Sequence, residues 1–393
     1  MNANLFLTLT LFIINPMLGT ISSIIILARI ESVSIFLISL MGGITAYNLV
    51  PYETMDLATH YYKFEALKEI SYYSIFNDGV NVLFYYYMKV LGDLGFNKEW
   101  VPFFSTFFGY FFLLTSLKRN LSESLHNSTR IYLYLLWFLT ISFLSLSNGI
   151  RSGLSSALFI YALQYVYNKK MFKAIVWGII STLVHSFVFP LFFIIILINL
   201  FNKLFSKRTL KLCLIACMVV SGLVGVLTIL ESIISSLSFI PYIDQIYKIY
   251  IVGDRWGSSA EFDLNTRIAQ FITQLPFFFS VFVLLISNQK NILFITAILI
   301  SCISIITFQF WVISERYQYV TILTTTFYLL SKESTFLLPK RLLFLVLFML
   351  QVIVTAWAFY RFRYMLIPSL AFITYPFLFC FYRTLDLSKL IKV

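Results

Sequence analysis

Charged side chains are scarce in this sequence, where Lys, Arg, Asp and Glu together make up 12% of 393 residues. Histidine occurs only three times, whereas hydrophobic residues account for 60% of the chain and the mean hydropathy is +0.88. A soluble protein would need far more polar surface, so the composition indicates an integral membrane protein. No stretch has low complexity or an obvious repeat, and no part of the chain suggests a separate soluble domain.

The motifs of several well-known enzyme classes are also missing. The chain has no P-loop glycine pattern, no HExxH, no GxSxG and no DxD pair. Without a DxD pair, we do not expect a metal-held nucleotide sugar to serve as donor on the cytoplasmic side. The four cysteines lie in apolar runs, and Cys213 and Cys217 have no histidine near them, so we interpret them as packing residues. We therefore expect no metal site, no disulfide framework and no cofactor.

The N-terminal segment lacks lysine and arginine before Arg29. A cleavable signal peptide begins with a basic region, so we expect the first helix to be retained. Pro16 is predicted to divide that segment into two pieces.

Apolar runs of membrane-spanning length fill most of the chain. A bilayer core needs about 20 apolar residues per helix, which predicts an all-α polytopic bundle of about 11 to 14 transmembrane helices in one domain, residues 1–393. Residues 79–91 are too short to cross and predict an interfacial or re-entrant helix, whose tyrosines Tyr85, Tyr86 and Tyr87 suit the membrane interface. The predicted spans are residues 5–28, 33–50, 100–117, 131–147, 152–167, 173–187, 188–201, 210–230, 267–287, 291–312, 317–331, 341–358 and 364–382.

Lysine and arginine are concentrated in some of the predicted loops and scarce in others. Cytoplasmic loops of membrane proteins are the ones that retain lysine and arginine. Placing the most basic loops inside leaves most acidic residues outside, together with the loop region 48–99 and the large loop 231–266. The formal net charge of +12 is therefore mainly a topology signal. A nucleic-acid partner would need a soluble basic surface, so none is expected. The outer face is where recognition or chemistry is predicted.

An arginine stands between two apolar runs in the segment "SLSNGIRSGLSSALF", residues 145–159. Arg151 opens a predicted helix on the outer side, where free backbone amides already favour an anion, so the position predicts a phosphate site. The alternative is an arginine held by a carboxylate or by exposed carbonyls of a loop. Gly149, Gly153 and Ala157 recur every four residues and predict close approach of a neighbouring helix.

Two further outer-side positions are candidates by the same argument. His185 ends an apolar run level with the start of the Arg151 helix, although a lone histidine is often only a packing residue. Arg316 begins another predicted helix, with Glu315 beside it and Tyr319 one turn later. The alternative for this group is a local Glu–Arg pair that holds the loop.

The outer loops contain the remaining candidates. Asp254 and Arg255, beside an aromatic residue, are typical of a sugar-binding loop, though loops of this composition are common. Asp56 and His60 are four residues apart and share a face if their segment is helical, with Tyr61 adjacent. A carboxylate and an imidazole there could bind sugar hydroxyls or manage a proton, or could simply cap and solvate a surface helix.

The order of these motifs resembles a known family. The pattern D-x-x-x-H-Y at Asp56, His60 and Tyr61 is followed by "NGIRSGLSSALF", then "NKKMFKAIVWGIISTLVHS", then "ERYQY". This order is similar to the EpsG-like branch of the O-antigen and exopolysaccharide repeat-unit polymerases, the Wzy proteins. The resemblance covers about residues 45–330, and Ser155 stands where alanine is more usual.

The resemblance implies a GT-C-like membrane glycosyltransferase in the bacterial inner (cytoplasmic) membrane, with its active site at the periplasm or outer leaflet. It implies a growing glycan on undecaprenyl diphosphate as donor and one repeat unit on the same lipid as acceptor. The chain would pass en bloc to the non-reducing end of the new unit, without a metal and with inversion. A chain-length regulator and a flippase are candidate protein partners, beside the lipid bilayer.

On this interpretation the residues divide into two groups. Arg151 and Arg316 would clamp the diphosphate, His185 would support it or orient the acceptor, and Asp56 would act as base. The expected substrate-binding residues are His60, Tyr61, Asp254, Arg255, Glu315 and Tyr319.

Two rival functions stay open. An O-antigen ligase uses the same donor but transfers the glycan to the lipid A core, and the motif order favours the polymerase over it. A flippase for the lipid-linked unit should have charges at mid-membrane and two related halves. Here the charges lie at the outer edge and the halves do not match, which disfavours a transporter.

Overall fold

The computed structural model describes residues 3–77, 81–121, 126–201, 206–221, 232, 235–236, 264–308 and 310–381. Within these ranges the chain is built from helices and short connections, and its only β-type pairing is an isolated bridge between Ser287 and Phe336. The predicted all-α class is confirmed. Four helices are long and apolar enough to cross a membrane, which agrees with a polytopic membrane protein: Arg29–Tyr47, Trp100–Asn120, Arg267–Ile286 and Lys340–Arg361.

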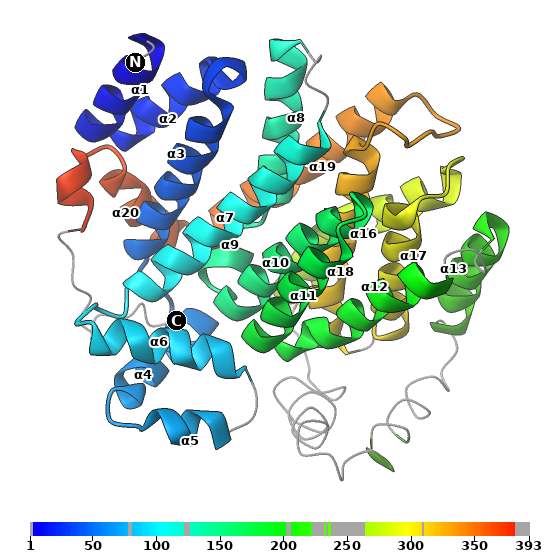
Figure 1. The fold of residues 1–393 in the computed structure, drawn as a ribbon, viewed down its shortest axis with the longest axis horizontal. Coiled ribbons are helices and arrows are strands. Elements are labelled where there is room, and N and C mark those ends of the chain that lie inside the picture. The colour runs from blue at the N-terminus through cyan, green and yellow to red at the C-terminus, as the bar shows by residue number, and fades with distance from the viewer. Residues whose placement is uncertain are drawn as a thin grey trace. The chain divides into compact units, whose positions relative to one another are not determined.

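The chain divides into two compact units, residues 1–192 with 358–393, and residues 193–357. Figure 1 shows the helices in chain order. Those of the first unit are α1 (Ala3–Ile14), α2 (Pro16–Ile25), α3 (Leu27–Tyr47), α4 (Asp56–Leu67), α5 (Tyr72–Asn77), α6 (Val82–Asp93), α7 (Trp100–Asn120), α8 (Asn127–Thr140), α9 (Phe143–Ser147), α10 (Ile150–Tyr167), α11 (Met171–Val184), η1 (Ser186–Val188), α20 (Arg363–Phe372) and η3 (Phe377–Phe381).

The second unit contains α13 (Lys207–Ser221), α16 (Leu264–Ile286), α17 (Ile292–Ile306) and α18 (Trp311–Leu330), while α12 (Phe189–Phe201) and α19 (Lys340–Arg361) run across the division. Helix α18 packs against α16 and α17. The hydroxyl of Ser304 lies 3.1 Å from that of Thr321, and the hydroxyls of Ser287 and Tyr328 also hydrogen-bond. Short polar side chains thus join apolar helices at close range.

The helix ends follow local sequence signals. Helix α1 ends at Ile14 and α2 begins at Pro16, with the Asn15 side chain accepting a hydrogen bond from the backbone amide of Leu18. The predicted break at Pro16 is therefore confirmed. The predicted span 131–147 is wrong as one helix, because Ser142 caps a new short helix, α9, by accepting a hydrogen bond from the amide of Ser145.

Three short helices form a group at one end of the first unit (Figure 1). Helix α6 contacts α4, α5 and α7. It is a short helix, as the sequence predicts for residues 79–91, whereas its interfacial or re-entrant position stays a prediction. Lys89 of α6 is nearly buried and donates hydrogen bonds to the backbone carbonyl of Lys68 and to the carboxylate of Asp93. The phenol of Tyr72 donates to the same carboxylate at 2.6 Å. These bonds fasten α4 and α5 to α6.

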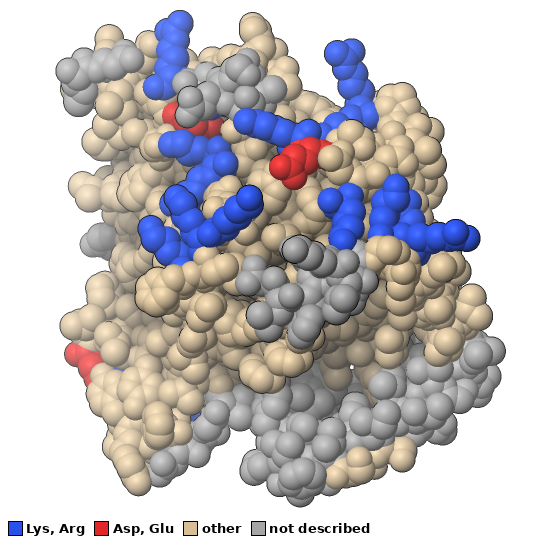
Figure 2. All heavy atoms as spheres, turned by 45° about the vertical axis from the view of Figure 1, so that its right-hand side comes forward, with Lys and Arg blue, Asp and Glu red and all other residues tan. Residues whose placement is uncertain are grey.

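The opposite ends of the long helices in the first unit carry their own polar contacts. Glu31 of α3 pairs with Arg130 of α8 at 3.0 Å and accepts a hydrogen bond from the Tyr134 hydroxyl at 2.9 Å. Arg119, in the last turn of α7, donates to Tyr165 of α10 at 2.8 Å. On the face drawn in Figure 2, Lys and Arg side chains are frequent, whereas Asp and Glu are sparse.

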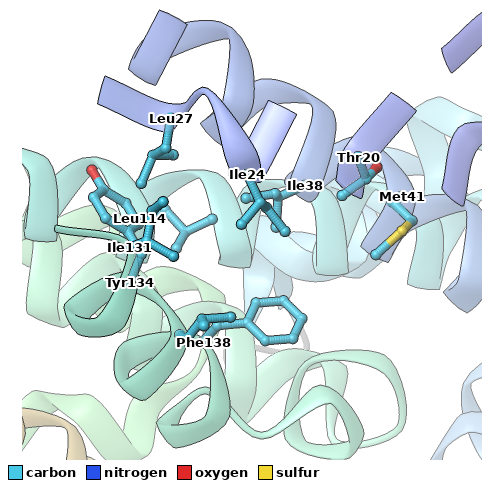
Figure 3. Close-up of a pocket in the computed structure, with 10 residues that line it drawn as sticks. Thr20, Ile24, Leu27, Ile38, Met41, Leu114, Ile131, Tyr134 and Phe138 are labelled. Atoms are coloured by element: carbon cyan, nitrogen blue, oxygen red, sulfur yellow. The ribbon is translucent and has the colours of Figure 1, made fainter. Parts of the chain in front are cut away.

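An apolar cavity of about 110 Å³ lies among α2, α3, α7 and α8 (Figure 3). No charged side chain lines it, so it offers nothing that would hold a phosphate. The lining residues are Thr20, Ile24, Leu27, Ile38, Met41, Leu114, Ile131, Tyr134, Leu135 and Phe138.

Candidate functional site

The first turn of α4 lies beside the start of α10. The backbone amide of Leu57 donates a hydrogen bond of 3.0 Å to the side-chain oxygen of Asn148, which immediately precedes the α10 cap. Asp56, the first residue of α4, is exposed at that point. A carboxylate is favoured at a helix N-terminus, so Asp56 suits this position at the surface of the junction. Two segments more than 90 positions apart thus meet at one place.

Arg151 lies in the first turn of α10, as the sequence predicts, and is partly buried. Its Nη1 donates a hydrogen bond of 3.1 Å to the hydroxyl of Tyr85 in α6. The guanidinium carbon lies 5.9 Å from the centroid of the same ring. Among the described residues, no carboxylate oxygen comes within 4.0 Å of this guanidinium. Its positive charge is oriented by a neutral tyrosine and is left without a counter-ion there.

His60, one turn after Asp56, is buried and packs its ring at 5.4 Å from that of Phe84. Helix α4 lies outside the predicted membrane spans. Burial lowers the pKa of His60 to about 3, and the nearby charge of Arg151 acts in the same direction. Both effects penalise the imidazolium. His60 is therefore a neutral imidazole near Arg151, able to form hydrogen bonds but not to add a second positive charge. Tyr61, its neighbour, is fully buried in the apolar cluster of this unit.

His185 follows the last residue of α11 in extended conformation, and its ring packs 5.1 Å from Phe187. The Ser181 hydroxyl donates to the carbonyl of Ser155 at 2.7 Å, which joins the end of α11 to α10. The amide of Ser186 donates to the side chain of Asn81, the residue that caps α6. The end of α11 and the starts of α6 and α10 therefore lie at one side of this unit.

Gly153 explains how α10 can begin so close to α9. A Cβ at this position would lie 2.0 Å from the carbonyl oxygen of Ser145 and 2.8 Å from the Cα of Leu146. No side chain fits there, so the predicted close approach at Gly153 is confirmed, with α9 as the neighbour. Backbone contact between the two helices fixes the direction in which α10 presents Arg151.

The chain matches the EpsG family over residues 31–377. It belongs to the EpsG family. The match extends the resemblance seen in the motifs toward both ends of the chain, and it suggests a polysaccharide repeat-unit polymerase, a glycosyltransferase-like enzyme of the membrane. No match was found among curated proteins or among solved structures. A GT-C-like architecture for this EpsG-family protein remains a prediction.

The other predicted residues of this EpsG-family protein lie elsewhere. Arg316 is in the second turn of α18, because that helix begins at Trp311, six residues before the predicted span 317–331. Its neighbours Glu315 and Tyr319 belong to the same helix, in the second unit. The role of Arg316 as a second clamp on the diphosphate stays a prediction. Asp254, Arg255 and most of the predicted loop 231–266 lie outside the described residues.

Two residues near Arg151 were not among the candidates taken from the EpsG-like motif order. Tyr85 was interpreted as an interfacial tyrosine of residues 79–91, yet its hydroxyl accepts the hydrogen bond from Arg151. Lys63 places its Nζ 5.4 Å from the centroid of the same ring. Lys63 is three residues after His60 and seven after Asp56, so the helical repeat could have revealed it. Among the described residues, no cluster of three His, Cys, Asp or Glu side chains could hold a metal ion.

The low pKa of His60 predicts an acid-dependent loss of stability. Between pH 6.5 and about 3 the unfolded chain binds a proton at this histidine that the folded chain does not, so stability falls as the pH falls. The expected slope is at most about 1.4 kcal/mol per pH unit. Chemical unfolding of the detergent-solubilised chain should show this slope in the wild type and a flatter one in His60→Gln.

Between pH 7 and 8 His60 is neutral in both states, so the two proteins should there change in parallel. Equal slopes for both proteins between pH 6 and 4 would contradict a buried neutral His60.

Proposed function

We propose that this protein is a membrane glycosyltransferase that polymerises undecaprenyl-diphosphate-linked repeat units at the outer leaflet of the bacterial inner membrane. The growing glycan moves en bloc to the non-reducing end of a new lipid-linked unit. One observation carries the proposal. At the junction of α4 and α10, Arg151 is partly buried, lies near His60 and has no carboxylate partner in the described residues.

The chemistry explains why such an arginine is useful. A hydroxyl oxygen of the acceptor sugar attacks the anomeric carbon of the donor, and the bond from that carbon to the diphosphate oxygen breaks. The electron pair leaves with undecaprenyl diphosphate, whose negative charge rises in the transition state. A pre-oriented guanidinium in a partly desolvated site stabilises that charge without rearranging. The Tyr85 hydrogen bond provides the orientation.

The proton of the acceptor hydroxyl needs a base. Asp56 is exposed and at the start of α4, where substrate can reach it, and we assign it this role. His60, kept neutral by burial and by Arg151, can donate or accept one hydrogen bond to a sugar hydroxyl. A single displacement inverts the anomeric configuration. Arg316, with Glu315 and Tyr319, is proposed as the second clamp on the diphosphate, and His185 as a group that orients the acceptor.

A genetic experiment separates this function from its rivals. Deleting the gene and separating the surface glycans on a gel should reduce a ladder of many bands to a single capped repeat unit, because export and attachment continue without polymerisation. Loss of all capped glycan would instead point to the ligase or the flippase. Complementation with the wild-type gene should restore the ladder, and an unchanged ladder in the deletion strain would contradict the proposal.

A further inference from the structure

A second cation approaches the ring that orients Arg151. The Nζ of Lys63 is 5.4 Å from the centroid of Tyr85, and the guanidinium carbon of Arg151 is 5.9 Å from it. The two cations come from α4 and α10, and the ring that both approach comes from α6. Both distances are in the range of cation–π contacts, which offset part of the cost of gathering like charges.

In the part of the chain that the structure describes, neither cation has a carboxylate partner. In the described ranges no carboxylate oxygen lies within 4.0 Å of Lys63 or Arg151. Lys68, the C-cap residue directly after α4, makes the contrast clear because its Nζ lies 2.6 Å from the carboxylate of Glu65. Two like charges placed near one another without a counter-ion repel, so the arrangement is stabilised when an anion arrives.

Lys63 lies on the same face of α4 as the candidate site residues Asp56 and His60. Asp56, His60 and Lys63 follow one another at positions i, i+4 and i+7, so they form one stripe along the helix. The remaining faces pack Leu57, Ala58 and Phe64 into the apolar cluster. His60 is neutral and Asp56 is acidic, which leaves Lys63 as the cation of this stripe.

We infer that Lys63 is a second phosphate-binding residue of the Arg151 site, and that Tyr85 is the positioning residue whose ring both cations approach. This inference rests on the proposed function. A single phosphate can be bound by the Arg151 fork alone, whereas a diphosphate presents two adjacent anionic groups and can use both cations. Lys63 therefore selects lipid diphosphate over lipid monophosphate.

Binding measurements on the full chain in detergent micelles test this role separately from activity. The probes are undecaprenyl diphosphate and undecaprenyl monophosphate, with affinities measured by native mass spectrometry or thermophoresis. We expect the wild type to prefer the diphosphate by about tenfold or more, and Lys63→Met to lose this preference while its affinity for the monophosphate stays within about twofold. Lys63→Arg should retain the preference.

Lys68→Met is the matched control, because it removes the same side chain at the C-cap of the same helix, where the lysine is paired with Glu65, and it should bind both probes like the wild type. Tyr85→Phe keeps the ring but removes the hydroxyl that accepts from Arg151, so it should weaken binding of both probes. A wild-type preference that persists in Lys63→Met would overturn the role of Lys63 and leave the proposed function standing. A wild type without any preference would contradict both.

Discussion

Replacing Arg151 with lysine is expected to slow glycan polymerisation by about 100- to 1,000-fold. Lysine keeps the positive charge but loses the planar fork, and its ammonium cannot both bond to Tyr85 and present two parallel donors to phosphate. In a complemented deletion strain the glycan ladder should shorten to the first few bands. In proteoliposomes the fall should be in the maximal rate, because the interaction strengthens as the diphosphate leaves.

The control for Arg151→Lys is Arg29→Lys, the same substitution at an exposed position near the start of α3. That variant should give a wild-type ladder and comparable amounts of protein in the membrane. A full-length ladder in Arg151→Lys, at normal protein levels, would show that the fork of Arg151 does not act in the reaction.

Gly153→Ala is expected to have the largest effect on the fold. The new Cβ would lie 2.0 Å from the Ser145 carbonyl oxygen, and backbone atoms cannot move aside as a flexible side chain can. Separating α9 from α10 should cost about 1 to 3 kcal/mol or more. The measurement is the thermal unfolding midpoint of the purified chain in detergent, together with its yield from the membrane.

Gly92→Ala provides the comparison, since it also adds one methyl group to a helix. A Cβ at Gly92 would meet its nearest atom, in the Lys68 side chain, at 3.5 Å, which is an ordinary contact. That variant should be neutral or slightly more stable because alanine favours helix over glycine. If Gly153→Ala were as stable as Gly92→Ala, the close contact between α9 and α10 would be wrong.

Local sequence signals account for the correct part of the fold. Composition and apolar run length determined the membrane class and the all-α architecture. Pro16 determined a helix break, and the helical repeat placed Asp56 and His60 on one face of α4. These features depend on residues a few positions apart, so they are visible without the fold. Ser142 is the same kind of signal, but it stands inside an apolar run whose length predicts one span. Its hydrogen bond to the amide of Ser145 instead starts a separate helix, α9, after α8 has ended.

Only the tertiary structure decided what surrounds Arg151. The sequence by itself placed this arginine at a helix start, and it predicts an outer-side location and a diphosphate as the bound anion. Packing of α4, α6 and α10 then brought Tyr85 to its guanidinium, put Lys63 at the same ring and left His60 buried and neutral. Such contacts join segments far apart in the chain, and a pKa depends on burial and neighbouring charge. Residue spacing predicts neither these long-range contacts nor the pKa of His60, because both arise only when the apolar faces of the helices have packed.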